Sequence, residues 1–403
     1  MRPRLMVAAA VAAALALAGC SGAATGGAPA PSRATTTAIG PAAAAPSAEA
    51  TSHGAGDTGA PGPNVILVRR AGGVPDGWGA RLRRIPGVAA VTRATRAQAL
   101  LRATGPRRVR AGFAVPLDTL VIRPRGYARM LPAAERAPLA RLGPGRALLS
   151  RSSARLRRAR VGSTLTLTGG RRLRVAGVVP DELVRSAELV VSASEGAHLA
   201  TRAPYLLAAV ETDSAARRAA RVFGTAPRSA VSALGPAPWT RRGLIARPVE
   251  LKLRFGEFAL RLPIGPDFVT PDPAWVRRDI RTTGVPVIGM VTCHRKMIPA
   301  LRAAMRELVR RHLQGLVDRS DYAGCYAPRR IPTSGTLSLH AWGLAVDLNA
   351  SRNPQGSKPH QDLRLVHVME RHGFWWGGRW PTVPDGMHFE YHGNGRPSAD
   401  EPF

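Results

Sequence analysis

Two stretches near the C-terminus carry residues suited to metal-assisted hydrolysis. They are residues 338–347, Ser-Leu-His-Ala-Trp-Gly-Leu-Ala-Val-Asp, and residues 385–390, Asp-Gly-Met-His-Phe-Glu. His340, Asp347 and His388 supply two imidazoles and one carboxylate, the set that a catalytic zinc ion uses when one position stays open for water. Asp385 lies three residues before His388. It is therefore placed to act on that water as a base without binding the metal.

The segments that must position these residues are predicted from periodicity. Polar and apolar residues alternate over 345–348 and 388–391, which predicts two strands that direct polar side chains into one cleft. The other expected elements are an initial strand through Leu251, Leu253 and 255–258, a helix over 275–280, a buried strand over 286–292, a helix from Pro299 through 316, and a helix through 363–369 that ends at Gly373. His312 falls on the apolar stripe of the long helix and is interpreted as a core or boundary histidine.

The two motifs together resemble the zinc D-Ala-D-Ala peptidases of the VanX/VanY type, relatives of which cut L-Ala-D-Glu bonds in cell walls. The resemblance covers roughly the last third of the chain. Such enzymes place an arginine shortly before the Ser-x-His motif, where it holds the substrate carbonyl or carboxylate. Arg329 is the first choice for this role and Arg330 the second, and a plain surface arginine is the alternative for either.

The same resemblance implies supporting roles for three more residues. Ser338 would hydrogen-bond the ligand cluster or the substrate. Residues 373–378 match a Gly-Phe-x-Trp-Gly-Gly segment of similar peptidases, so Trp376 is expected to support the cleft. Glu390 shares a strand face with His388 and is expected to orient a ligand histidine instead of binding the metal itself.

The length and charge of the chain limit the number of domains and the kinds of partner that we expect. A chain of 403 residues suggests two folded units with appendages. The formal charge of +32 comes from arginines spread along the folded part, because lysine occurs only at Lys252, Lys296 and Lys358. This spread does not predict nucleic-acid binding. A basic protein outside the cell would still be drawn to anionic wall polymers and membrane surfaces.

The N-terminus resembles a bacterial lipoprotein signal over residues 1–20. A basic start is followed by an apolar run over 7–18 and by Leu-Ala-Gly-Cys, which ends at Cys20. Cys20 would be acylated, holding the protein at the outer face of the cytoplasmic membrane; the alternative is an ordinary signal peptide with an incidental cysteine. Residues 21–63 are rich in Ala, Gly, Pro, Ser and Thr and are interpreted as a disordered tether.

Cysteine usage supports an extracytoplasmic location. Once Cys20 carries lipid, Cys293 and Cys325 remain, and an even remainder in an exported protein favours a disulfide. A metal site built from Cys293 and His294 is the alternative.

The middle region, 64–240, contains a β-hairpin signal but no catalytic constellation. Leucines alternate with polar residues on both sides of Gly169-Gly170. With the apolar residues 147–150, this stretch resembles the extracytoplasmic core domain of MacB/FtsX-type ABC permeases. The interpretation is a binding or spacing module, with an ABC permease as its candidate partner, and a plain scaffold is the alternative.

These expectations define an α+β protein with two folded parts. An α/β module over 64–240 precedes a zinc peptidase domain over 249–403, which has a small antiparallel sheet and flanking helices. The predicted function is zinc-dependent hydrolysis of bonds to D-amino acids in peptidoglycan stem peptides, as in D-alanyl-D-alanine carboxypeptidases. The alternatives are a non-catalytic wall-binding protein and a lipoprotein that assists an ABC transporter.

Overall fold

The computed structural model describes residues 62–185, 187–237, 239, 248–331 and 336–393. The predicted lipoprotein signal, its Cys20 and nearly all of the predicted tether lie outside the described residues. No helix within the described ranges is both long enough and apolar enough to span a membrane.

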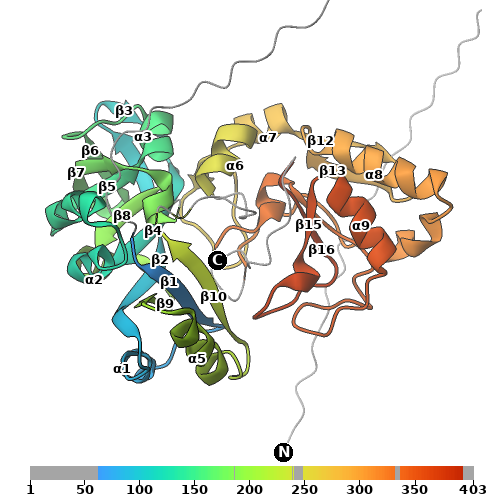
Figure 1. Cartoon of the computed structure of the whole chain (residues 1–403). Coiled ribbons are helices and arrows are strands. Elements are labelled where there is room, and N and C mark those ends of the chain that lie inside the picture. The colour runs from blue at the N-terminus through green and yellow to red at the C-terminus, as the bar shows by residue number, and fades with distance from the viewer. Residues whose placement is uncertain (1–61, 186, 238, 240–247, 332–335, 394–403) are drawn as a thin grey trace, which may run out of the picture. The chain divides into compact units, whose positions relative to one another are not determined.

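Residues 64–236, called here the sheet region, are built around one large sheet (Figure 1). Its strands are β1 (Asn64–Arg70), β2 (Val88–Thr104), β3 (Arg107–Arg108), β4 (Phe113–Ile122), β5 (Arg146–Ser150), β6 (Thr164–Leu167), β7 (Arg172–Val179), β8 (Leu189–Ser192), β9 (Ala200–Val210) and β10 (Ser229–Pro236). Its helices are α1 (Trp78–Arg83), α2 (Pro124–Ala128), α3 (Arg151–Arg157), α4 (Ala193–Gly196) and α5 (Asp213–Phe223).

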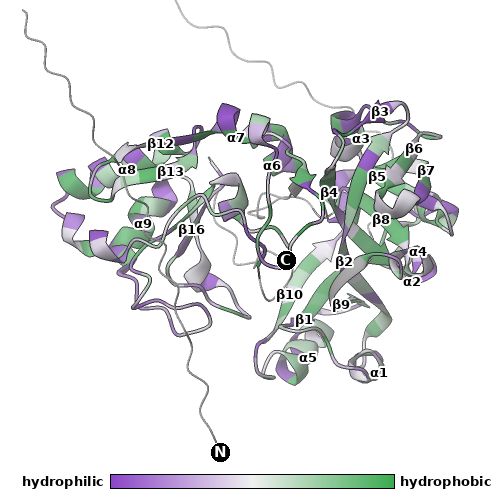
Figure 2. Cartoon of the chain, turned by 180° about the vertical axis from the view of Figure 1, so that it is seen from behind, coloured by the Kyte–Doolittle hydropathy of each residue, from purple (hydrophilic) through white to green (hydrophobic). Residues whose placement is uncertain are grey.

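The path of the sheet closes on itself. The strand order is β10-β1-β9-β2-β6-β7-β5-β8-β4, and β4 also pairs with β2. Every residue of β4 is buried, and the apolar strands β5 and β8 are coloured as hydrophobic in Figure 2. The predicted hairpin is present as the antiparallel pair β6–β7, joined through two glycines with positive φ. Burial on both faces explains why long stretches of β4, β5 and β8 read as apolar runs without alternation.

Residues 248–393, called here the C-terminal region, have a hydrophobic core drawn from their own residues. The helices are α6 (Pro248–Phe255), α7 (Pro273–Asp279), α8 (Ile298–Arg310) and α9 (Leu363–Arg371). The strands are β11 (Leu260–Arg261), β12 (Ile280–Val285), β13 (Gly289–His294), β14 (Ala345–Asp347), β15 (Phe374–Trp376) and β16 (His388–Tyr391). β11 pairs with β4, β12 with β13, and the order β14-β16-β15 forms the predicted small antiparallel sheet.

The helices α8 and α9 pack together through a charged contact as well as apolar side chains. Glu307 of α8 accepts hydrogen bonds from Arg371, at the end of α9, and from His372 Nε2 at 2.8 Å. Burial alone would raise the pKa of Glu307, but these hydrogen bonds outweigh it and lower the pKa to about 2. The two helices are therefore joined by a carboxylate that stays ionised.

Three expectations for this region were wrong in detail. Residues 251–255 belong to helix α6, because Leu251 and Phe255 are buried one turn apart while Leu253 is 43% exposed. The strand expected over 286–292 begins only at Gly289, and the preceding residues form the turn of the hairpin with β12, where Val287 has a φ of 68°. His312 lies beyond the end of α8 and is exposed instead of belonging to the core.

Candidate metal centre

Three buried side chains from the two motifs converge in the C-terminal region. His340 Nε2 lies 3.2 Å from His388 Nδ1 and 3.1 Å from Asp347 Oδ2, and His388 Nδ1 lies 2.8 Å from Asp347 Oδ1. Tetrahedral ligands at zinc–ligand distances of 2.0–2.1 Å are about 3.3 Å from one another. The spacing and the donor types therefore fit a zinc ion bound through His340 Nε2, an Asp347 oxygen and His388 Nδ1.

The small sheet places two of these donors side by side. Asp347 on β14 is the direct partner of His388 on β16 in the antiparallel register. Directly opposed residues project their side chains from the same face of a sheet. The backbone of Asp347 is held on its other side too, because its N–H donates to Gly324 O at 3.1 Å.

A capped turn holds the third donor. The Ser338 hydroxyl accepts a hydrogen bond from the N–H of His340 at 3.2 Å, at the start of the short 3-10 helix Leu339–Trp342. Gly343 ends this helix with a φ of 64°, and a Cβ there would lie 2.7 Å from the backbone N of His294. Only glycine satisfies both conditions, which accounts for the Gly in the Ser-x-His-x-x-Gly motif.

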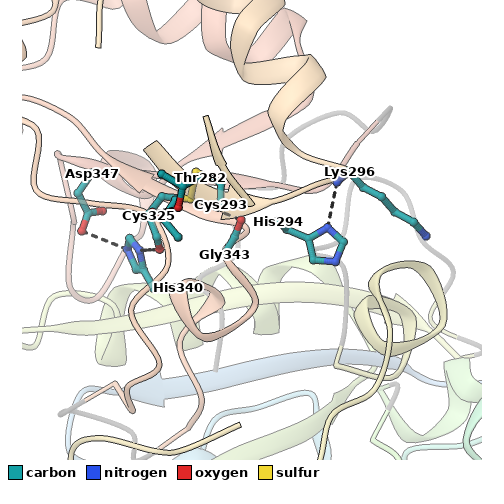
Figure 3. Close-up of a disulfide and its surroundings, with 9 residues drawn as sticks. Thr282, Cys293, His294, Lys296, Cys325, His340, Gly343 and Asp347 are labelled. Carbon is teal, nitrogen blue, oxygen red and sulfur yellow. Dashed lines mark hydrogen bonds and ion pairs between the residues drawn. A yellow bond between two sulfur atoms is a disulfide. The ribbon is translucent and has the colours of Figure 1, made fainter. Parts of the chain in front are cut away.

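The predicted disulfide fixes the orientation of the His340 ring. Cys293 and Cys325 are bonded with their Cα atoms 5.5 Å apart. The carbonyl oxygen of Cys325 accepts a hydrogen bond from His340 Nδ1 at 2.7 Å, as Figure 3 shows beside the Asp347 contact. Because Nδ1 carries the proton in this bond, Nε2 keeps its lone pair for a metal.

Glu390 orients the second imidazole. It accepts hydrogen bonds from His388 Nε2 at 3.1 Å and from His392 Nε2 at 3.0 Å. The ring of His392 packs against that of Trp375, with centroids 4.1 Å apart. Glu390 therefore contacts the ring nitrogen of His388 that faces away from His340 and Asp347.

The buried charges favour a cation at this position. Burial would raise the pKa of Asp347, but the charges and hydrogen bonds of His340 and His388 outweigh it and hold that pKa well below its usual range. Burial would lower the pKa of His388, yet Asp347 and Glu390 raise it well above its usual value. Burial raises and the two histidine contacts lower the pKa of Glu390, to about 2. Asp347 and Glu390 are both buried and ionised, and such carboxylates need a nearby positive charge to offset the cost of burial. A proton or a metal ion can supply that charge.

Asp385 lies buried beside the donors with one oxygen unused. Its Oδ2 accepts a hydrogen bond from Gln355 Nε2 at 3.1 Å, whereas Oδ1 is buried and has no partner among the described residues. Burial raises the pKa of Asp385, while the nearby charge of His388 acts in the opposite direction. A buried carboxylate oxygen without a partner is costly, so this atom is suited to receive a proton from water or substrate.

Two tryptophans support the turn that carries Asp385. The indole N–H of Trp376 donates to the carbonyl of Gly386 at 2.8 Å. The ring of Trp380 lies 5.4 Å from that of His388, centroid to centroid. This hydrogen bond ties Trp376 to the 385–388 turn.

Arg329 and Arg330 are placed differently. Arg329 Nη2 lies 4.0 Å from Asp347 Oδ2, and its side chain is 35% exposed, so it can also reach a substrate. Arg330 pairs with Leu337 in an isolated bridge, and burial lowers its pKa. Successive residues of an extended segment point to opposite faces. Of the two, Arg329 is the arginine beside the metal donors.

An exposed phenylalanine lies next to Arg329. Phe268 and Arg329 are partners in an antiparallel bridge. The flanking hydrogen bonds run from Val269 N to Pro328 O at 2.9 Å and from Arg330 N to Asp267 O at 2.7 Å. Such bonds on either side define a non-hydrogen-bonded pair, in which the two side chains are closest and share a face. Phe268, 72% exposed, therefore stands at the rim of the site.

Phe268 and Gln355 were missed in the sequence. Both lie outside the named helices and strands, where no periodicity marks the direction of a side chain. The one available signal was an aromatic residue in a Pro- and Gly-containing segment before the arginine pair, and that signal is common in loops.

Two imidazoles and one carboxylate, with a further buried carboxyl group beside them, are the groups that a hydrolytic metal centre uses as its donors and its base. Residues 332–391 match the model of the peptidase family described as D-alanyl-D-alanine carboxypeptidase. The match includes His340, Asp347, Asp385 and His388. Residues 332–391 therefore carry a domain of this family. No curated protein matches the chain.

The middle of the chain is similar to two solved domains, one from a transporter and one from a permease protein. The extracellular domain of the noncanonic ABC-type transporter YknZ from Gram-positive bacteria is 15% identical, with a TM-score of 0.28; the match covers 42% of this chain and 100% of that domain. A permease-protein domain from Porphyromonas gingivalis is 17% identical, with a TM-score of 0.26, and covers 47% of this chain and 94% of that one.

Proposed function

We propose that this protein is a zinc-dependent peptidase that hydrolyses a bond to a D-amino acid in peptidoglycan stem peptides. The observation that carries the proposal is the convergence of His340, Asp347 and His388 beside the partnerless oxygen of Asp385. The family match over 332–391 supports the choice of a peptide substrate.

The three donors would hold the ion through the atoms that face one another. When bound, zinc lowers the pKa of a coordinated water to about 7 and polarises the scissile carbonyl. The Cys325 carbonyl and Glu390 keep the two imidazoles turned toward the ion, since each accepts the proton on the nitrogen that does not face it.

The remaining roles belong to the chain itself. Asp385 takes the proton of the attacking water on Oδ1 and returns it to the departing amine, while Gln355 holds Oδ2 in place. Arg329 stabilises the negative charge that develops on the carbonyl oxygen, or holds the substrate carboxylate. Phe268 borders the site on the same face as Arg329 and offers an apolar surface to the substrate.

Mass spectrometry of products tests this proposal. The zinc-loaded chain is incubated with a stem pentapeptide that ends in D-Ala-D-Ala. Release of one alanine identifies a carboxypeptidase, release of the dipeptide a dipeptidase, and a cut at L-Ala-D-Glu an endopeptidase. An intact peptide after incubation with fully zinc-loaded, folded protein contradicts the proposal and favours a non-catalytic wall-binding protein.

We also propose an extracytoplasmic location with a lipid anchor at Cys20. The Cys293–Cys325 disulfide supports export, because such bonds persist mainly outside the cytoplasm. Labelling with a radioactive fatty acid, which Cys20→Ser should abolish, tests the anchor. A permease partner for residues 64–240 stays a prediction, and a pull-down from membranes with and without these residues tests it.

A further inference from the structure

A cavity lined by arginines lies in the sheet region. It has a volume of about 1210 Å³ and is bounded by α1, β2, α2, α4, β9 and the short 3-10 helix Ala137–Arg141. Five arginines line it, and no aspartate or glutamate does: Arg83, Arg93, Arg123, Arg125 and Arg136. Several like charges around one cavity repel one another and raise the local concentration of anions.

The arginines differ in how far their charge is already compensated. Arg93 pairs with Asp76 at 2.9 Å, and Arg136 Nε donates to the Leu131 carbonyl at 3.0 Å. Within the described residues, the side chains of the other three make no hydrogen bond or ion pair: Arg83, Arg123 and Arg125. All three are exposed.

The chain pairs arginines with carboxylates elsewhere in the same region. Arg96 bonds to Asp118 at 2.7 Å, and Arg157 bonds to Glu188 at 2.5 Å. Those two arginines are buried, whereas Arg83, Arg123 and Arg125 are exposed around one cavity and, among the described residues, carry charge that no carboxylate offsets. Arg83 belongs to α1, and Arg123 and Arg125 lie at the start of α2. Because the arginines come from two elements, they can contact a ligand at more than one point.

The walls add hydroxyl groups and apolar surface. Ser192 and Ser194 contribute hydroxyls 2.9 Å apart, and Leu139 and Leu206 contribute apolar surface. At Gly126 a Cβ would lie 2.5 Å from Thr92 Oγ1, so the glycine lets α2 pack directly on β2 and bring Arg123 and Arg125 to the cavity.

We propose that this cavity binds a ligand with several phosphodiester groups. The guanidinium group matches the geometry of phosphate oxygens and remains charged at any physiological pH. Arginines mounted on separate elements fit anions that are spaced along one ligand or one surface. Glycerol phosphodiesters occur repeatedly along a soluble polymer and, one per headgroup, across a phospholipid surface, so both sources present several of them to the cavity.

Calorimetry and vesicle flotation test the proposal on the full chain carrying Cys20→Ser, which cannot be acylated. The probes are a glycerol-phosphate oligomer in solution, and phosphatidylglycerol vesicles with phosphatidylcholine vesicles as the neutral reference. The cavity variant combines Arg83→Ala, Arg123→Ala and Arg125→Ala. A control variant of equal net charge combines Arg107→Ala, Arg306→Ala and Arg310→Ala, three exposed arginines that do not line the cavity.

We expect the cavity variant to bind the oligomer at least about tenfold more weakly than the unsubstituted chain, and the control variant to stay within about threefold. If the cavity variant loses binding to phosphatidylglycerol vesicles while the control variant keeps it, and neither variant differs with the oligomer, the proposal is supported and the ligand is a lipid headgroup. No binding in either arm overturns it, as does an equal loss in both variants, which would show a general effect of charge. If the triple variant fails to fold, the single changes Arg83→Gln and Arg125→Gln carry the same comparison.

Discussion

Replacing Glu390 with glutamine should weaken zinc binding without removing a ligand. The carboxylate accepts two hydrogen bonds, from His388 Nε2 at 3.1 Å and from His392 Nε2 at 3.0 Å. A glutamine side chain has one acceptor and one NH₂ donor, so it can accept only one of them. If His388 loses its acceptor, its proton can move to Nδ1, the atom that faces His340 and Asp347. That tautomer cannot bind a metal through Nδ1.

The expected loss follows from this geometry and from the removed charge. Partners that orient a metal ligand typically contribute 10- to 100-fold to metal affinity, which corresponds to about 1.4–2.7 kcal/mol. We expect Glu390→Gln to fall in this range, because the variant keeps one of two hydrogen bonds but loses a buried negative charge close to the cation. Competition with a chromogenic chelator at pH 7 measures the zinc dissociation constant directly.

The matched control is Glu307→Gln, which removes the same charge from the contact between α8 and α9. It should leave the zinc dissociation constant within about twofold of the unsubstituted protein. Unchanged zinc affinity in Glu390→Gln would refute the assignment of His388 Nδ1 as the ligand atom. Equal losses in both variants would point to a general effect on stability.

Three further predictions concern substrate, pH and the disulfide. Phe268→Ala should raise KM for a stem peptide about tenfold with kcat nearly unchanged, because it removes apolar contact next to Arg329 but no reacting group; steady-state kinetics with an unchanged KM would contradict this. Glu307→Gln should lower the free energy of unfolding by about 1 kcal/mol near pH 7, a value reduced for solvent screening. Because the pKa of Glu307 is lowered to about 2 in the folded protein, the difference should persist above about pH 5 and shrink as the pH falls toward 2, which urea unfolding at pH 3–8 measures. Removing the disulfide with Cys293→Ser and Cys325→Ser should lower the free energy of unfolding by about 2–4 kcal/mol and weaken zinc binding, since the Cys325 carbonyl orients His340; an unaltered zinc affinity would contradict that link.

The parts of the site that the sequence predicted are those in which spacing alone determines geometry. In a strand, His388 and Glu390 must share a face, and the structure has them so. The capping role of Ser338 and the helix end at Gly343 were not predicted, although both lie at short fixed offsets from His340. The pairing of Asp347 with His388 needed only two short strands and an antiparallel register.

The parts that could not be predicted depend on contacts between distant segments. The Gln355–Asp385 hydrogen bond joins a loop to a turn thirty residues away, and nothing in the local pattern marks either end. The pairing of Phe268 with Arg329 is equally remote in sequence. The strand expected at residues 251–255 was wrong for a different reason. Apolar residues at three alternate positions fit a strand, but they also fit a helix in which the middle residue faces solvent.

The most direct test of the account is the turnover of Asp385→Asn at matched zinc content. The change keeps the shape of the side chain but removes its ability to take a proton. We predict one bound zinc ion per chain in both proteins and a loss of about 10²–10⁴ in kcat on the stem peptide. Equal turnover at equal zinc content would contradict the assignment of Asp385 as the base, and with it the proposed hydrolytic centre.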